Sequence, residues 1–288
     1  MAITLITGCS SGIGLATALH LARQGHHVVA TMRNPERGAA SLLAAAESER
    51  LKLEVLALDV TDAPAIDSVL SHLRERGLAI DVLVNNAGIG QEGAVEETSE
   101  GDFRRILETN FFGALRMIRG VLPDMRVRGS GRIINISAMS GRMTFVNHAA
   151  YAASKHALEA MSEVLAQEVY EFGVHVSVIE PGYVATRFFS KSGPPPDPYS
   201  PYASHGNRHL RVRMRLLEEA EAPEAVARAI EHAITAPEPR FRYLVGDDAE
   251  MLVGGRERMS DEEWLTANRP MSLADEDDFW REKFGFEI

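Results

Sequence analysis

A tyrosine and a lysine that lie four residues apart have the side chains best suited to acid–base chemistry in this sequence. Tyr151 and Lys155 bracket the segment YAASK, which reads as helix. At this spacing both side chains lie on one helix face, so the ammonium can sit beside the phenol. A phenol alone titrates near pH ~10, and a nearby cation lowers its pKa by favouring the phenolate. The pair is a candidate acid–base device, with a packed tyrosine beside a solvated lysine as the alternative.

A glycine-rich segment has the composition of a dinucleotide-binding turn. The sequence TGCSSGIG starts at Thr7, follows a short apolar run and opens a helical stretch. Glycines permit a tight turn and a close backbone approach, while a helix N-terminus offers N–H groups and a positive dipole end to a pyrophosphate. An ordinary glycine turn is the alternative. The residues to which we assign cofactor binding here are Gly8, Ser10, Ser11, Gly12, Ile13 and Gly14.

The end of the second apolar run favours NADP over NAD as the cofactor. An acidic residue there would hold the ribose 2′-hydroxyl of NAD, but the run ends in Arg33 without an acid. Arg33 can pair with a 2′-phosphate, helped by the Ser11 hydroxyl, although a surface arginine without a ligand is the competing interpretation. Asp59, beside Val60 after the third run, can accept a hydrogen bond from the adenine amino group or cap a following helix.

Short apolar runs alternate with longer amphipathic segments, and this pattern places the residues above. It predicts an α/β fold with a doubly wound, Rossmann-type parallel sheet of about seven strands and helices on both faces. The expected strands are Thr4–Thr7, Val28–Thr31, Leu53–Leu58, Val82–Asn85, Arg132–Ile136, His175–Ile179 and Phe241–Val245.

Residues 1–249 are expected to form a single dinucleotide-binding and catalytic domain. Within it, the periodicity degrades over residues 187–215, which contain a proline cluster followed by arginines and histidines. Such a segment predicts a substrate lid, while a solvated helix face is the alternative for its basic part. Residues 250–288 are acidic and contain several aromatic residues, so we expect an appendage that packs on the body or on a neighbouring subunit.

Bulk properties exclude several classes of partner. The net charge of -11 argues against nucleic acid or an anionic membrane surface. No apolar run reaches the ~18 residues that span a bilayer, and no basic segment precedes the apolar residues 1–22 as in a signal peptide. Cys9 is the single cysteine, so there is no internal disulfide, and its position suggests no metal site. We expect a cytoplasmic protein without membrane insertion or metal.

Several motifs, in order and at closely similar spacing, resemble the short-chain dehydrogenase/reductase family from Met1 to about Val245. They are the glycine segment at Thr7, Asn85-Asn86-Ala87-Gly88, Asn110, the pair Tyr151 and Lys155, and Pro181-Gly182 with Thr186. The glycine segment and Ala30-Thr31-Met32-Arg33 resemble the NADP-using branch that includes the 17β-hydroxysteroid and retinol dehydrogenases.

The resemblance implies roles for these residues. Tyr151 would give its proton to a substrate carbonyl oxygen as hydride arrives from the nicotinamide, or remove it in the reverse direction. Lys155 would hold the nicotinamide ribose and lower the tyrosine pKa, and Asn110 would support a water between Lys155 and solvent. Further cofactor contacts would come from Asn86, Ala87, Gly88, Pro181, Gly182, Val184 and Thr186. The family also implies a homodimer or homotetramer through the helices around 102–127 and 151–172.

One departure from the family pattern bears on activity. The family's substrate-orienting serine falls at Ala138, which cannot donate a hydrogen bond. Ser137 precedes it, with its side chain expected on the opposite strand face, and Ser140 follows; either could substitute if the backbone bulges. The leading hypothesis is an NADP(H)-dependent oxidoreductase that interconverts a ketone and a secondary alcohol on an apolar or aromatic small molecule. The alternatives are a catalytically impaired NADP-binding protein and an engineered serine-to-alanine variant.

Overall fold

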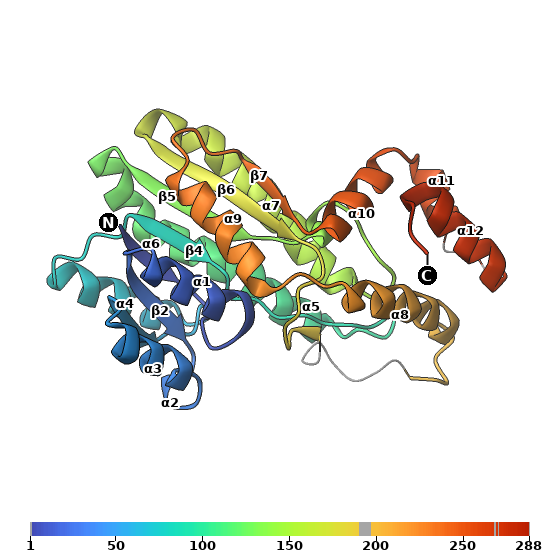
Figure 1. Cartoon of the computed structure of the whole chain (residues 1–288), viewed down its shortest axis with the longest axis horizontal. Coiled ribbons are helices and arrows are strands. Elements are labelled where there is room, and N and C mark those ends of the chain that lie inside the picture. The colour runs from blue at the N-terminus through green and yellow to red at the C-terminus, as the bar shows by residue number, and fades with distance from the viewer. Residues whose placement is uncertain (1, 190–196, 268, 270, 288) are drawn as a thin grey trace.

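A seven-stranded parallel sheet forms the centre of the protein (Figure 1). The computed structural model describes residues 2–189, 197–267, 269 and 271–287. The strand order β3-β2-β1-β4-β5-β6-β7 confirms the predicted doubly wound, Rossmann-type sheet. The bounds are β1 (Ile3–Ile6), β2 (His27–Met32), β3 (Leu53–Ala57), β4 (Val82–Asn85), β5 (Gly131–Ile136), β6 (Val174–Pro181) and β7 (Arg242–Val245).

Neighbouring residues along a strand belong to different hydrophobic cores, because successive side chains of a strand point to opposite faces of the sheet. Ile6 and Ile134 lie in one core, whereas Leu5 and Ile133 lie in the other. All four side chains are fully buried. Burial on both faces explains why these strands read as nearly continuous apolar runs rather than as alternating patterns.

Helices cover both faces of the sheet (Figure 1). The Ile6 core is closed by α1 (Gly12–Arg23), α3 (Ala40–Glu49) and α9 (Pro223–Thr235). The Leu5 core is closed by α4 (Ala63–Glu75), α6 (Gly113–Arg128) and α7 (Ala149–Val169). The short helices α2 (Pro35–Gly38) and α5 (Glu100–Leu107) precede α3 and α6.

A π-helix, η1 (Glu108–Phe112), interrupts the passage from α5 to α6. The wider π turn changes the direction in which side chains leave the helix, and such turns often lie at functional sites. Asn110 stands in this turn and is buried. The interruption therefore falls on one of the residues to which the sequence assigns a role.

The C-terminal third adds a separate hydrophobic core beside the sheet (Figure 1). It is built by α8 (Ala203–Glu218), α10 (Asp247–Glu257), α11 (Asp261–Thr266) and α12 (Leu273–Phe284). Met139 and Tyr183, from loops that follow β5 and β6, belong to the same core. The C-terminal helices thus pack against the loops at the end of the sheet.

Two expected segments look different in three dimensions. The basic part of the expected lid, residues 187–215, is largely the helix α8, in line with the alternative interpretation, and residues 190–196 lie outside the described residues. The expected division after residue 249 lies inside α10. The first turn of α10 contains Asp247, Asp248 and Glu250, where acidic side chains are favoured by the helix dipole.

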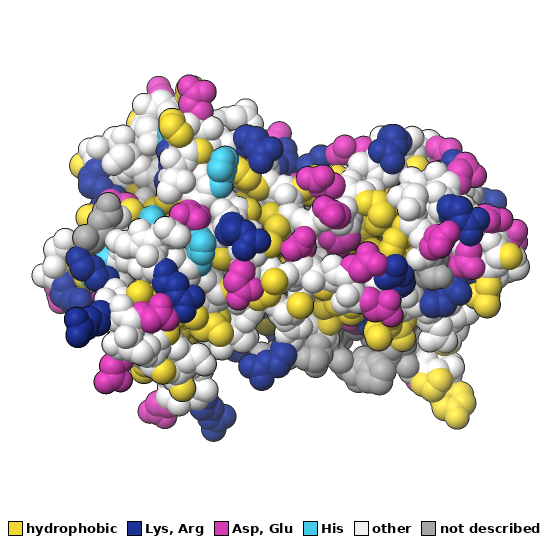
Figure 2. Space-filling model, in the orientation of Figure 1, with side chains coloured by type: hydrophobic (Ala, Val, Ile, Leu, Met, Phe, Trp, Pro, Cys, Tyr) yellow, Lys and Arg dark blue, Asp and Glu magenta, His cyan; other side chains and the backbone are white. Residues whose placement is uncertain are grey.

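Charged groups of both signs are interspersed over the face in Figure 2. Among the described helices, none is long and apolar enough to cross a membrane. The described residues also contain no group of three His, Cys, Asp or Glu side chains that could hold a metal ion.

The single cysteine, Cys9, is buried, and burial raises the pKa of its thiol to about 12.

Replacement of Phe284 by alanine tests the packing of the C-terminal helices. The Phe284 ring lies against Gly255 of α10 and 4.7 Å, centroid to centroid, from the Trp280 ring. We expect Phe284→Ala to lower the free energy of unfolding by about 3–5 kcal/mol, measured by denaturant titration, because it leaves a cavity. Leu265→Ala, at a side chain that is 71% exposed, should change it by less than about 0.5 kcal/mol. Equal effects would contradict the described packing.

Candidate active site

A cavity of about 620 Å³ lies at the carboxyl ends of the strands, where the loops after β1, β4, β5 and β6 meet. Most of the residues to which the sequence assigns a role line it. They are Gly8, Ser10, Ser11, Gly12, Ile13, Arg33, Asp59, Val60, Asn86, Ala87, Gly88, Ser137, Ala138, Tyr151, Lys155, Pro181, Gly182, Val184 and Thr186. Two assigned residues, Gly14 and Asn110, lie behind the lining, where they support it.

The glycine loop has the shape that a pyrophosphate needs. Gly8 and Gly12 adopt φ angles of +75° and +60°, a region that residues with a side chain rarely enter. Ser11 precedes α1, and no side chain caps the first N–H groups of this helix. These groups and the helix dipole remain available to an anionic ligand in the cavity. The residues present therefore fit a dinucleotide.

Asn86 and Thr7 hold this loop against the end of β4. The Asn86 amide Nδ2 donates to the carbonyl oxygens of Thr7 at 2.8 Å and of Gly8 at 3.1 Å. In return, Thr7 Oγ1 accepts from the backbone N–H groups of Asn86 and Ala87, both at 3.0 Å. A Cβ on Gly14 would lie 2.4 Å from Asn86 Nδ2. Thr7 was not assigned a role from the sequence, although its place before the first glycine marks it.

Arg33 lies in a basic hollow that adjoins the glycine loop. The hollow also contains two arginines that the sequence analysis did not assign, Arg37 and Arg187. No acidic side chain is among the described residues that line it, which are Ser10, Ser11, Arg33, Asn34, Arg37, Gly38 and Arg187. Arg37 follows Arg33 closely in the chain, but Arg187 comes from the loop after β6, so only the fold brings it here.

Asp59 lies at the end of the third strand segment and lines the cavity. Its Oδ1 accepts hydrogen bonds from the Thr61 backbone N–H at 2.9 Å and the Thr61 hydroxyl at 2.8 Å. The following helix, α4, is capped instead by Asp62, which accepts from the Ala65 N–H. Asp59 is therefore not the helix cap that the alternative interpretation allowed.

Tyr151 and Lys155 project from α7 into the cavity; Lys155 is buried, and Tyr151 is partly buried. Lys155 Nζ donates to the carbonyl oxygen of Ile136 at 2.8 Å and lies 5.7 Å from the centroid of the Tyr151 ring. Burial lowers the pKa of Lys155 to about 8, an effect that the charge of Glu159 opposes. Burial raises the pKa of Tyr151. The expected fall in the tyrosine pKa is wrong for this structure, because desolvation disfavours the phenolate.

Asn110 ties the π-helix to the loop after β4 and to α7. Its Oδ1 accepts from the Ile89 N–H at 2.9 Å, and its Nδ2 donates to the Ile89 carbonyl and to Ser154 Oγ, both at 3.0 Å. A Cβ on Gly88 would lie 3.5 Å from Asn110 Oδ1 and 3.8 Å from Lys155 Nζ. Gly88 thus lies between Asn110 and Lys155, and the hydrogen bonds of Asn110 hold the loop after β4 and Ser154 in place.

Ala138 and its two neighbouring serines lie in different surroundings. All three residues line the cavity, but the Ser137 hydroxyl has different surroundings. Ser137 Oγ is buried and has no hydrogen-bond partner among the described residues. A Cβ added to Gly141 would contact both Ser137 Oγ and Glu159, so the two side chains lie near the same point. The Ser137 hydroxyl therefore faces the Glu159 side of the loop.

Aromatic rings form the remaining wall of the cavity. The Phe188 ring lies 5.5 Å from both the Tyr151 and the Phe189 rings, and Phe189 lies 5.3 Å from Tyr183, all between centroids. His148 also lines the wall, and burial, with the nearby Arg213, lowers its pKa to about 4. The imidazole is therefore neutral at neutral pH. Tyr183 was not singled out in the sequence, because an isolated tyrosine carries no spacing signal.

Comparison with known proteins places these features in context. A family model described as short chain dehydrogenase matches residues 2–196. Estradiol 17-beta-dehydrogenase 1 of Rattus norvegicus is 39% identical over 253 residues, which are 84% of this chain and 73% of that protein. A short-chain dehydrogenase from Streptomyces avermitilis superposes with a TM-score of 0.79 at 35% identity, covering 98% of this chain and 96% of that one. An actinorhodin polyketide ketoreductase variant with NADPH has a TM-score of 0.72 at 28% identity, covering 84% and 95%.

Substitution of Thr7 tests the link between the glycine loop and β4. Thr7→Val removes the acceptor of two backbone N–H groups, so we expect a loss of about 1–3 kcal/mol in the free energy of unfolding and weaker dinucleotide binding. Thr7→Ser keeps the oxygen and should retain most of both properties. Thermal unfolding and calorimetric titration with dinucleotide measure the two effects. If Thr7→Val matched Thr7→Ser in both measurements, the hydroxyl would have no role in shaping the loop.

Proposed function

The chain belongs to the short-chain dehydrogenase family, and we propose that it is an NADP(H)-dependent oxidoreductase that interconverts a ketone and a secondary alcohol. One observation carries the proposal: a single cavity is lined by the glycine loop and Arg33 and also by Tyr151 and Lys155. A dinucleotide held by the loop would lie along the same cavity as the acid–base pair.

The preference for NADP rests on the hollow around Arg33. Three arginines, Arg33, Arg37 and Arg187, line it together with Ser10 and Ser11. Guanidinium groups and hydroxyls match the oxygens of a 2′-phosphate, and arginine binds phosphate in a bidentate way. A free ribose 2′-hydroxyl would instead call for a carboxylate acceptor. The NADPH bound to the polyketide ketoreductase, a structure of similar fold, supports the same choice.

The protonation states point to Tyr151 as a proton donor in carbonyl reduction. Because burial raises its pKa, the phenol holds its proton at neutral pH and can donate it to a carbonyl oxygen. The Lys155 ammonium, 5.7 Å from the ring centroid, then stabilises the phenolate that remains. When bound, NADPH supplies the hydride. Asn110 holds the π-helix and Ser154 in place beside this pair.

The wall of rings suggests an apolar or aromatic small-molecule substrate. Phe145, Tyr183, Phe188 and Phe189 line the cavity beside Tyr151. Such rings bind apolar groups through buried area and ring contacts. The estradiol in the name of the rat relative, an apolar molecule with an aromatic ring, is compatible with this class.

Association through the helices around 102–127 and 151–172 remains our proposal for assembly as a homodimer or homotetramer. Phe112 and Val164 lie on these segments and are 41% and 53% exposed in the single chain. Large apolar side chains exposed on a helix face are suited to burial in an interface between copies.

Ala138 is the observation that favours the second candidate function, a nucleotide-binding protein with impaired catalysis. Ala138 lines the cavity without a donor for a substrate oxygen. The presence of Tyr151, Lys155 and Asn110 in one buried cluster favours the enzyme, because a decayed site would have lost more of its members. Turnover measured beside nucleotide binding separates the two candidates.

Arg33→Ala tests the cofactor choice. Loss of one charge-assisted contact should raise the dissociation constant of NADPH by about 10- to 150-fold, while NADH binding stays nearly unchanged. Arg23→Ala is the matched control, since Arg23 pairs with Glu49 on the protein surface, away from the hollow. Fluorescence titrations with both nucleotides provide the constants. An unchanged NADPH affinity in Arg33→Ala would contradict the assignment.

Ala138→Ser tests the catalytic assignment. A new hydroxyl donor to the reacting oxygen should raise kcat by about 10²–10³-fold, and Tyr151→Phe in the same background should abolish the gain. Steady-state rates with a panel of ketones and secondary alcohols, including hydroxysteroids, are the measurement. If Ala138→Ser has no effect while Ser140→Ala removes activity, the neighbouring serine has the role. If no variant turns over any compound, the nucleotide-binding candidate replaces the enzyme.

A further inference from the structure

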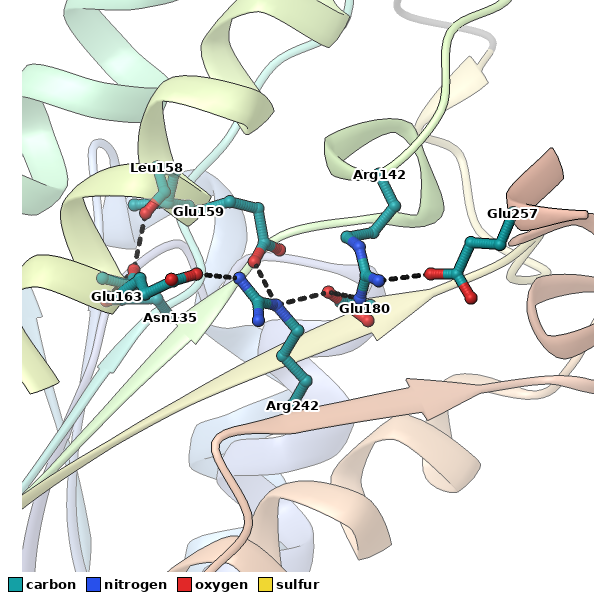
Figure 3. A network of polar contacts seen from close by, with 9 residues as sticks. Asn135, Arg142, Leu158, Glu159, Glu163, Glu180, Arg242 and Glu257 are labelled. Atoms are coloured by element: carbon teal, nitrogen blue, oxygen red, sulfur yellow. Dashed lines mark hydrogen bonds and ion pairs between the residues drawn. The ribbon is translucent and has the colours of Figure 1, made fainter. Parts of the chain in front are cut away.

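Two buried carboxyl groups share one guanidinium group (Figure 3). Glu159 comes from α7 and Glu180 from the end of β6, and their side chains are 6% and 0% exposed. Arg242 of β7 reaches both: its Nε lies 3.1 Å from Glu159 Oε2 and 3.3 Å from Glu180 Oε1. Arg142, which follows the 3₁₀-helix η2 (Met139–Gly141), lies 3.3 Å from the same oxygen of Glu180.

The charges in this cluster do not balance if every carboxyl is ionised. Two exposed carboxylates complete it: Glu163 pairs with Arg242 at 2.7 Å, and Glu257 pairs with Arg142 at 2.5 Å. Four carboxyl groups thus face two guanidinium groups. Glu159 Oε1 and Glu180 Oε2 have no hydrogen-bond partner among the described residues. Glu159 and Glu180 are like charges on one guanidinium group, and Arg142 is the other arginine that pairs with Glu180. Their mutual repulsion in a buried place favours retention of a proton on one of them.

Three members of the cluster, Glu159, Glu180 and Arg142, lie close along the chain to residues that line the cavity. Glu159 is one helical turn beyond Lys155 on α7, so the two side chains lie on the same face of the helix, and the Glu159 charge raises the pKa of Lys155 against the effect of burial. Glu180 directly precedes Pro181 and Gly182, which line the cavity. Arg142 follows the segment that contains Ala138, and a Cβ on Gly141 would touch Glu159. The cluster therefore joins the three elements that surround the reacting groups.

We propose that Glu159 and Glu180 are positioning residues for the reaction: through their shared Arg242 they hold α7 against the end of β6, and the Glu159 carboxylate stabilises the ammonium form of Lys155. The catalytic meaning of this statement rests on the proposed function, but the electrostatic coupling does not. Lys155 would remain protonated at neutral pH although it is buried. Glu180, which burial and the charge of Glu159 push to a pKa of about 7, would hold the proton that the cluster retains.

The groups that face these residues are few. Lys155 is faced by the Tyr151 phenol and by Glu159 on its own helix, by the Ile136 carbonyl of β5, and by Gly88 and Asn110. Glu180 is faced by Glu159, Arg142 and Arg242. Glu159 is therefore the carboxylate to remove if the coupling to Lys155 is to be broken.

Titration of Lys155 in lysine labelled with ¹³C tests the coupling without any need for turnover, in the full-length protein. We expect Glu159→Gln to lower the titration midpoint of Lys155 by about 1 pH unit, since it removes the opposite charge one helical turn away, and nearby opposite charges shift a pKa by about 1–3 units. Glu163→Gln is the matched control: it also contacts Arg242 but is 55% exposed, and it should leave the midpoint unchanged. Lys155→Met assigns the signal. An equal midpoint in Glu159→Gln and the parent would overturn the proposal.

Glu180→Gln supplies a second test that holds even if Glu159→Gln does not fold. Glu180→Gln keeps the Glu159 carboxylate, so the Lys155 midpoint should stay close to that of the parent, and a fall as large as in Glu159→Gln would overturn the proposal. The variant also changes stability. In the parent, the folded state keeps a proton that the unfolded chain releases, so stability is lost as pH rises from about 4.5 towards 7.

Glu180→Gln removes this titration. The difference in Tm between the variant and the parent should therefore shift in favour of the variant by several degrees as the pH is raised from 5 to 8. A constant Tm difference over that range would contradict the retained proton.

If the protein is active, its kcat/KM should fall at a lower pH in Glu159→Gln than in the parent, because the high-pH limb of the profile follows the Lys155 midpoint. Glu163→Gln should leave this limb at the pH of the parent. If no carbonyl is turned over while the Lys155 midpoint moves as expected, the proposed function fails and the coupling stands.

Discussion

Burial of the parallel sheet on both faces is the constraint on which the rest of the structure depends. Side chains of β1, β4, β5 and β6 are enclosed by helices on either side, so polar groups along the strands would find no water. Polar and flexible residues are therefore concentrated where the strands end. Thr7 and Gly8 follow β1, Asn86 follows β4, and Ala138 lies just beyond β5. Because these strands are neighbours in the sheet, their ends form one continuous cavity, as is general for open α/β sheets.

Burial also sets the electrostatics of the site. Lys155 is nearly removed from water, and the free-energy cost of an ammonium there is offset by the Ile136 carbonyl and by the charge of Glu159. The same low-dielectric surroundings keep Tyr151 protonated. A phenol that holds its proton next to a cation is suited to donate that proton when a neighbouring oxygen becomes more basic. The acid–base pair thus depends on packing as much as on its spacing along α7.

The C-terminal helices pack against the wall of the cavity rather than stand apart from it. The core that contains Trp264, Trp280 and Phe284 also contains Met139 and Tyr183, from loops at the edge of the cavity. Arg213 of α8 contacts Glu92 of the cavity wall. Changes in these helices would therefore alter the part of the cavity that faces a substrate, whereas the cofactor side is built from the first two thirds of the chain.

The sequence by itself determined the parallel sheet, the glycine turn, Arg33 and the pair Tyr151 and Lys155, because these depend on local periodicity and on spacings within one segment. Only the tertiary structure decided which distant groups meet. It placed Arg187 beside Arg33 and joined Glu159 to Glu180 through Arg242. It also reversed the expected direction of the Tyr151 pKa, since desolvation depends on everything packed around a group and not on its neighbour in the helix. The aromatic C-terminal residues became part of the cavity's surroundings for the same reason: long-range contacts leave no periodic signal in a sequence.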